Sequence, residues 1–109
     1  RESIEAFQKA AELDPKWYEP YYHLGDVYLS IRDYVNGIPA IEKAIAIDNA
    51  DPESHYYLCI AYFETDKVDL AEKECGTTLK LDPTHIDAKD IMDEIAAKKA
   101  FATEDDVAY

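Results

Sequence analysis

The sequence predicts an all-α fold built from stacked helix pairs, and three observations carry this prediction. The first is a period of 34 residues, by which Leu24 corresponds to Leu58, and Tyr28 to Tyr62. A fixed period of this length indicates one supersecondary unit stacked on copies of itself. The second is that apolar residues recur every three or four positions, as on one face of a helix. The third is the small number of chain-breaking residues, with 3 glycines and 5 prolines among 109 residues.

The repeat resembles the tetratricopeptide repeat, a helix–turn–helix unit of the same length. The same shift relates Gly37 to Ala71 and Ile41 to Cys75, so the register holds in the second half of the unit as well. The resemblance covers residues 3–98. It implies a right-handed α-solenoid with one orphan helix, two complete helix pairs and a C-terminal capping helix.

The predicted domain organisation follows this register. A tetratricopeptide domain is expected over residues 1–100, followed by a short tail. Its parts are a partial repeat at 3–16, complete repeats at 18–51 and 52–85, a capping helix at 86–100, and an acidic flexible tail at 101–109. Because the chain begins in the middle of a repeat and without a methionine, we expect it to be a fragment of a longer protein.

Two helix boundaries are predicted from single residues. Pro39 falls where the second helix of the first complete repeat should run, and a proline deep inside a helix costs ~3 kcal/mol or more. We therefore expect a kink there or a late start, with Asn36 as the N-cap and Gly37 as the first helical residue. The last helix is expected over residues 85–100, with Thr84 as its cap.

The charge of the chain restricts its partners. Its 24 acidic and 11 basic residues give a net charge of −13, whereas nucleic acids and anionic membranes require clustered lysine and arginine. The balance favours basic partners, although an acidic surface also serves solubility alone. The chain has no run of 18 apolar residues and no pattern of a signal peptide, so a cytoplasmic location without membrane contact is expected.

Few residues are candidates for chemistry. His55 and Cys59 lie four residues apart on one helix and could in principle share a metal or form a nucleophile–base pair. Neither alternative has the further ligands or the orienting residue that it needs, so both side chains are interpreted as packing residues. Cys59 and Cys75 are too few for a disulfide framework and are expected to be two small, buried apolar residues.

The acidic face of the last helix allows a second alternative. Asp87, Asp90 and Glu94 share this face, and carboxylates can bind a hard cation. No calcium-binding loop accompanies them, so a solvated acidic face is favoured. Glycine-rich phosphate loops and the motifs of serine or zinc hydrolases are also missing from the sequence. We therefore expect no enzyme activity, no metal and no cofactor.

The resemblance implies that the first helix of each pair lines a concave groove, while Tyr21, Leu24 and Tyr28 pack inward. The residues one step round the helix are then the candidate partner-binding residues. They are Glu19, Tyr22, His23, Asp26, Glu53, Tyr56, Tyr57, Ile60, Phe63, Glu64, Asp87, Asp90 and Glu94, with Leu29, Ser30, Ile91 and Lys98 at the same face. Tyrosines and apolar residues surrounded by charges are typical of a binding surface.

One subfamily of tetratricopeptide domains binds the C-terminal carboxylate of heat-shock chaperones through a clamp of lysine, asparagine and arginine. The matching places in this chain are Tyr22, Asp26, Tyr57, Asp87 and Asp90, none of which is a cation or an asparagine. The clamp is therefore absent, and a free carboxylate would be repelled.

The sequence predicts a non-catalytic protein-interaction module that binds a basic and apolar partner segment in an acidic, tyrosine-rich groove. The alternative is a structural scaffold fragment that acts through self-association. The orphan first helix would leave Ile4, Phe7 and Ala11 partly exposed, and such a patch could form a weak homodimer through residues 1–13. The partner itself is not identified by the sequence.

Overall fold

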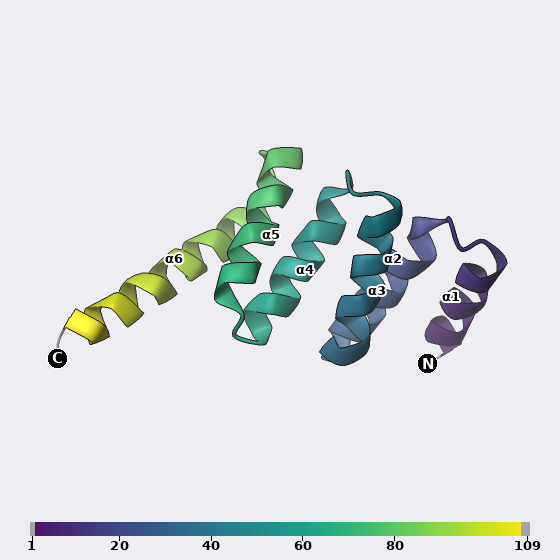
Figure 1. The fold of residues 1–109 in the computed structure, drawn as a ribbon, viewed down its shortest axis with the longest axis horizontal. Coiled ribbons are helices and arrows are strands. Elements are labelled where there is room, and N and C mark those ends of the chain that lie inside the picture. Colours follow the sequence, from purple (N-terminus) through teal and green to yellow (C-terminus); the bar gives the residue numbers. More distant parts are fainter. Residues whose placement is uncertain (1, 108–109) are drawn as a thin grey trace.

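The computed structural model describes residues 2–107, and the side chains of residues 3–101. Over this range the chain forms six α-helices and no strand, as the repeat pattern predicts (Figure 1). They are α1 (Glu2–Leu13), α2 (Tyr18–Ser30), α3 (Tyr34–Ile47), α4 (Pro52–Glu64), α5 (Val68–Leu81) and α6 (Ile86–Val107). None of them is long and apolar enough to span a membrane.

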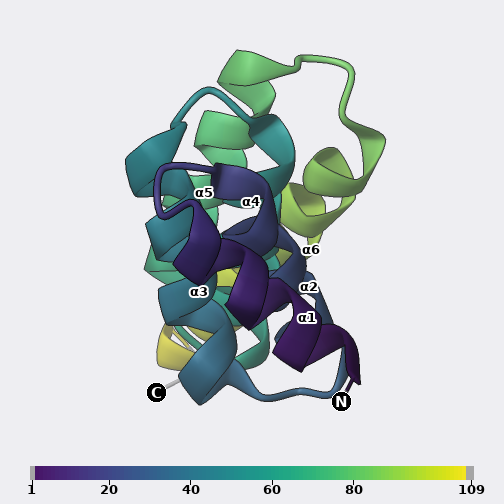
Figure 2. The same ribbon diagram turned by 90° about the vertical axis from the view of Figure 1, so that its right-hand side faces the viewer.

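The helices stack side by side in chain order along an elongated molecule of 56 × 27 × 19 Å (Figure 1). The helices α2 and α3 form one antiparallel pair and α4 and α5 the next, while α1 packs on α2 and α6 packs on α5. Seen from the N-terminal end, α3 and α5 lie on one side, and α2 and the start of α6 lie on the other (Figure 2). The contacts of α4 with both α2 and α6 complete the layer of first helices.

The start of α3 differs from the prediction. The helix begins at Tyr34 because the Asp33 carboxylate accepts a hydrogen bond from the Asn36 backbone N–H at 3.2 Å, which makes Asp33 the N-cap. The predicted late start at Asn36 and Gly37 is therefore wrong. Pro39 lies inside the helix. Its nitrogen carries no hydrogen to donate to the carbonyl of Val35, one turn earlier. The side chains of Val35 and Pro39 are both exposed, so this gap in the hydrogen bonding faces solvent.

The last helix differs from the prediction at both ends. His85 caps α6, because its Nδ1 accepts the Ala88 N–H at 3.1 Å, whereas the expected cap Thr84 bonds to Asp82 instead. The helix continues through Val107, beyond the predicted end at residue 100, over a stretch without glycine or proline to stop it. The predicted tail thus begins inside a helix, and residues 108–109 lie outside the described residues.

The two cysteines are fully buried, as predicted, but they are joined to each other. The disulfide links α4 to α5, and the two Cα atoms lie 5.3 Å apart. The prediction of two separate apolar residues was wrong because Cys59 and Cys75 hold facing positions of one helix pair. Together with Ala71, Ala88 and Ile95 they form the core of the second repeat.

The orphan helix α1 is partly exposed at Ile4 and Phe7, as predicted, but not at Ala11. Ala11 is buried, Phe7 and Ile4 are half-buried, and Leu13 at the end of the helix is 80% exposed. Packing against α2 accounts for the burial of Ala11. The exposed apolar positions of α1 are thus Leu13 and, in part, Ile4 and Phe7.

Candidate functional site

Six aromatic rings form a continuous line that crosses the molecule from α1 to α6. We call Phe7, His23, Tyr22, Tyr57, Tyr56 and His85, in this order, the aromatic line. The helices α2 and α4 each contribute two neighbouring residues, and α1 and the start of α6 contribute the ends. From His23 onward the line therefore runs across the first helices of successive repeats, where a concave groove was predicted, and only Phe7 belongs to the orphan helix α1.

The distances between neighbouring rings are those of direct aromatic contacts. From Phe7 onward, successive ring centroids lie 5.0, 5.3, 5.2, 6.0 and 4.7 Å apart. Offset and edge-to-face pairs are favourable at 4.5–7 Å, by about 0.5–1.5 kcal/mol beyond their area burial. The rings are half-buried except for His85, which is buried. They thus form a surface whose side chains are already fixed before a ligand arrives.

The phenol groups on this surface stay neutral. Burial is the main cause that raises the pKa of Tyr22, and its hydrogen bonding with Tyr57 adds to the shift. Burial also raises the pKa of Tyr57 and of Tyr56, with further contributions from nearby carboxylates such as Asp26 and Asp87, respectively. The three hydroxyl groups are therefore available as hydrogen-bond donors and acceptors.

Several carboxylates lie near the aromatic line, such as Asp26 near Tyr57 and Asp87 and Asp90 near Tyr56. Six of the seven predicted acidic residues are exposed, namely Glu19, Asp26, Glu64, Asp87, Asp90 and Glu94. Among the described side chains, only Glu64 of these six forms an ion pair, a long one of 4.0 Å to Arg32. Such an exposed pair contributes little. The rim therefore carries negative charge that the protein itself leaves largely uncompensated.

The seventh carboxylate, Glu53, is bound within the protein. It accepts a hydrogen bond from His85 at 2.5 Å, and because Nδ1 of this histidine caps α6, its Nε2 carries the proton. His85 thereby connects α6 to α4 beside the Tyr56 ring. Glu53 was predicted as a groove carboxylate, but its main contact is structural.

Two further predicted groove residues on α4, Ile60 and Phe63, are both half-buried. The Lys98 ammonium lies 5.5 Å from the centroid of the Phe63 ring and pairs with Asp66 at 2.7 Å. This lysine also lowers the pKa of the exposed Asp66 carboxyl. The only lysine among the groove positions is thus compensated by a carboxylate outside them.

The sequence pattern missed the two ends of the aromatic line. Phe7 was predicted to be partly exposed on the orphan helix, but its stacking on His23 was not foreseen. His85 precedes the predicted last helix, and no pattern in the sequence relates it to Tyr56. A histidine directly before a helix could have been noted as a possible cap.

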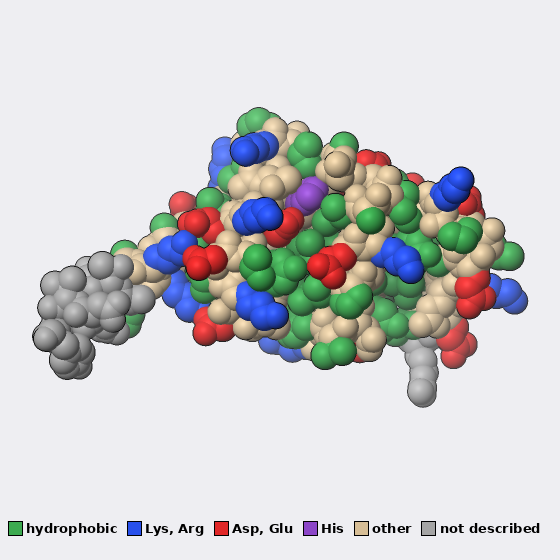
Figure 3. All heavy atoms as spheres, viewed as in Figure 1, with side chains coloured by type: hydrophobic (Ala, Val, Ile, Leu, Met, Phe, Trp, Pro, Cys, Tyr) green, Lys and Arg blue, Asp and Glu red, His purple; other side chains and the backbone are tan. Residues whose placement is uncertain are grey.

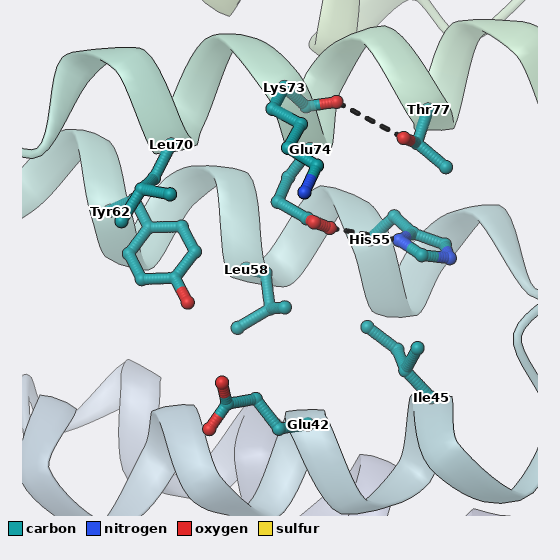
Figure 4. A pocket seen from close by; sticks show the side chains of 9 residues that line it. All are labelled: Glu42, Ile45, His55, Leu58, Tyr62, Leu70, Lys73, Glu74 and Thr77. Atoms are coloured by element: carbon teal, nitrogen blue, oxygen red, sulfur yellow. Dashed lines mark hydrogen bonds and ion pairs between the residues drawn. The ribbon is translucent and has the colours of Figure 1, made fainter.

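A second polar cluster lies on another face of the molecule, between α3, α4 and α5. Figure 3 shows this side, where acidic and basic side chains alternate around an apolar area. A pocket of about 410 Å³ lies here, and Figure 4 draws the residues that line it. In it the His55 ring faces the Glu74 carboxylate at 3.1 Å and the Asn49 carbonyl at 2.9 Å. Both ring nitrogens are engaged and Cys59 is disulfide-bonded, which removes the metal and nucleophile alternatives for this pair.

The comparison with protein families agrees with the fold. Residues 18–51 match the family model of the tetratricopeptide repeat, the same span as the first complete repeat predicted from the period. A comparison with curated proteins found no match. Residues 18–51 are therefore a tetratricopeptide repeat, and the six helices form a solenoid of the tetratricopeptide type.

Solved structures of similar fold include domains in complex with peptides. The first tetratricopeptide domain of Spaghetti (RPAP3), bound to the HSP90 peptide SRMEEVD, superposes with a TM-score of 0.86 at 18% identity, over 89% of this chain and 77% of that one. The type III secretion chaperone SycD of Yersinia enterocolitica, in complex with a peptide of the translocator YopD, gives 0.83 at 16% identity, over 88% and 79%. MamA gives 0.84 at 24% identity, over 89% of this chain and 57% of its own. These similarities show a shared fold.

Proposed function

We propose that this chain is a non-catalytic protein-interaction module that binds a basic segment with apolar anchor residues along its concave face. The observation that carries the proposal is the aromatic line with its rim of uncompensated carboxylates. Aromatic side chains dominate binding energy where they are rigid and partly desolvated. A surface of this kind needs no rearrangement of its own rings before it binds.

The chemistry of the surface favours arginine and lysine in the bound segment. Their cationic groups can pair with Asp26, Asp87 or Asp90 at the rim. They can also lie over the faces of Tyr22 and Tyr57, where a cation–π contact contributes about 0.5–2 kcal/mol. The long aliphatic parts of both side chains pack on the same rings. One residue type thus uses the apolar floor and the acidic rim together.

The same chemistry disfavours acidic peptides. The HSP90 peptide bound to the Spaghetti domain, SRMEEVD, ends in an acidic sequence. In this chain the positions that would hold a carboxylate clamp carry tyrosine or aspartate, and like charges facing each other lower affinity. We therefore propose a ligand class opposite in charge to that peptide, in spite of the shared fold.

A peptide array probed with the 109-residue chain at physiological salt tests this proposal. It should contain peptides matched in apolar content that differ in charge. The expected result is selective retention of the lysine- and arginine-rich members. Equal retention of neutral and acidic members, or retention of none, would contradict the proposed function.

The alternative function, a scaffold that acts through self-association, has one supporting observation. Leu13 and Phe101, near the two ends of the described helices, are 80% and 65% exposed. A weak homodimer through residues 1–13 would cover the first of them. Sedimentation of the wild-type chain and of a Phe7→Glu variant decides this point, because an interfacial charge without a partner should give a monomer. A wild type that stays monomeric at high concentration rejects the homodimer.

A further inference from the structure

The layer of second helices is open between α3 and α5. In the layer of first helices, Cα atoms of α4 come within 8 Å of both α2 and α6. Within the described residues, by contrast, no Cα atom of α3 lies within 8 Å of one of α5. Each of these two helices packs on the first helix of its own complete repeat, α2 or α4. The opening therefore lies between two complete repeats, in the middle of the stack.

The pocket beside His55 occupies this opening, and we call it the α3–α5 groove. Its volume of about 410 Å³ falls in the range of ligand sites, which span about 300–1,000 Å³. In Figure 4 the Leu58 side chain of α4 lies between the residues of α3 and those of α5. Leu58 is buried, Ile45 is half-buried and Leu70 is 44% exposed, so the apolar lining reaches the surface. The complete lining is Glu42, Ile45, His55, Leu58, Tyr62, Leu70, Lys73, Glu74 and Thr77.

The two sides of the α3–α5 groove carry opposite charges. Glu42 on α3 and Lys73 on α5 are both exposed, and among the described side chains neither of them forms an ion pair. The Glu74 carboxylate, in contrast, faces the His55 ring at 3.1 Å, and both side chains are largely buried. A partner in the groove therefore meets one uncompensated carboxylate on the α3 side and one uncompensated ammonium group on the α5 side.

We propose that the α3–α5 groove is a second protein-binding surface, whose partner is an amphipathic helix with basic residues along one edge of its apolar face and acidic residues along the other. The helices α3 and α5 run in the same direction, so a third helix can lie lengthwise between them (Figure 1). Its apolar residues, spaced by three or four positions, insert toward Leu58. The basic edge pairs with Glu42 and the acidic edge with Lys73.

This surface selects a different partner from the concave face. The rim of the aromatic line is acidic and favours a basic segment, whereas the α3–α5 groove offers one charge of each sign and favours a helix of balanced charge. The two surfaces lie in different layers of helices, so both can be occupied at once (Figure 2). A second copy of the chain is a poorer occupant of the groove, because a net charge of −13 on each copy opposes their approach.

Titration of the 109-residue chain with helix-forming peptides of about twenty residues tests the apolar contact, since shorter helices are marginal in water. One peptide carries leucines every three or four positions, with lysines along one edge and glutamates along the other. The same peptide with alanine at its two central leucines should bind about tenfold or more weakly. Amide chemical shifts should change around Ile45, Leu58 and Thr77. Absence of binding, or changes around Tyr22 and Tyr57 instead, would overturn the proposal.

Charge reversal tests the pairing across the groove, with two more peptides that carry glutamate or lysine on both edges. Glu42→Lys should weaken binding of the mixed peptide about threefold or more and prefer the glutamate peptide, whereas Lys73→Glu should prefer the lysine peptide. The shift of the Thr77 amide reports binding at this site alone. Lys80→Glu, at another exposed position of α5, is the matched control and should keep the preference of the wild type. Unchanged preferences in both groove variants would overturn the proposal.

A blocking variant separates this site from the concave face and from self-association. Leu70→Glu places a charge in the groove and should abolish binding of the mixed peptide, whereas Ile86→Glu, at an exposed apolar position of α6, should keep it. A basic peptide selected on the array should bind to both variants as to the wild type, so failure of the groove leaves the proposed function intact. If the mass of the wild type rises with concentration and Leu70→Glu abolishes this rise, a second copy fills the groove and the proposal is wrong.

Discussion

Gly25 lies directly beneath the side chain of Ile41, so that a Cβ atom on Gly25 would come within 2.0 Å of Ile41 Cδ1. One repeat later the same two positions hold Cys59 and Cys75, which are joined by a disulfide. The two repeats thus bring their helices together at the same place by different means. In the first repeat the close approach is possible because Gly25 has no side chain. In the second repeat the two helices are joined by the disulfide.

The contact beneath Ile41 makes Gly25→Ala destabilising. An added methyl group must displace a fully buried side chain, which costs about 1–3 kcal/mol, and this exceeds the gain of up to ~1 kcal/mol in helix propensity. Thermal unfolding should therefore show a lower Tm. The matched control is Gly76→Ala, where an added Cβ meets nothing within 4 Å, so its Tm should rise. Equal shifts in both variants would show that the helices are not packed as described.

Loss of the disulfide should destabilise the second repeat. In the chain-entropy model, a cross-link that closes a loop of about fifteen residues stabilises a fold by ~3 kcal/mol, so the double variant Cys59→Ala with Cys75→Ala should lose stability of this order. A reductant should lower the Tm of the wild type and leave that of the double variant unchanged. An unaltered wild-type Tm in reductant would show that the cysteines are thiols in solution. The cytoplasmic location favoured by the sequence also depends on this result, because disulfides are rare in that compartment.

The role of His85 as a cap leads to a third prediction. His85→Ala should cost about 0.5–2 kcal/mol and speed up amide hydrogen exchange in the first turn of α6, because the Ala88 N–H loses its acceptor. His85→Asn should restore most of the protection, since asparagine is also a good N-cap, although it abandons the contact with Glu53. Identical exchange in the alanine and asparagine variants would argue against the cap.

The rings at the centre of the aromatic line should contribute to binding more than to stability. Tyr56 also packs against the core of the second repeat, so Tyr57 is the better test. We expect Tyr57→Ala to weaken the binding of a basic peptide selected on the array by about 1–3 kcal/mol with little change in Tm. The control is Tyr34→Ala, at a half-buried position on α3 outside the aromatic line, which should leave peptide binding unchanged. A Tyr57 variant that unfolds would show that this ring belongs to the core.

The acidic rim should act through its charge. Binding of the same peptide is expected to weaken as salt rises, and Asp90→Lys with Glu94→Lys should weaken it further. Glu12→Lys with Glu42→Lys changes the net charge by the same amount on the helices α1 and α3, both sites being exposed. Calorimetric titration of both double variants separates the local effect from the overall charge. Equal losses would assign the effect to net charge alone.

The fold could be predicted because the period and the apolar spacing repeat over nearly the whole chain, so single exceptions do not change the register. The exceptions depend on contacts that have no period. Asp33 caps α3 through a hydrogen bond from its side chain to the Asn36 backbone, and the helix continues through Pro39. The disulfide required knowing that Cys59 and Cys75 face each other, and the place of His85 depends on Glu53, 32 residues away.

Chemical-shift mapping of the backbone amides during titration with an array-selected basic peptide tests the central claim most directly. The changes should concentrate on α2, α4 and the start of α6, around Tyr22, Tyr57 and His85. Changes that concentrate instead on α3 and α5, around the pocket of His55, would contradict it.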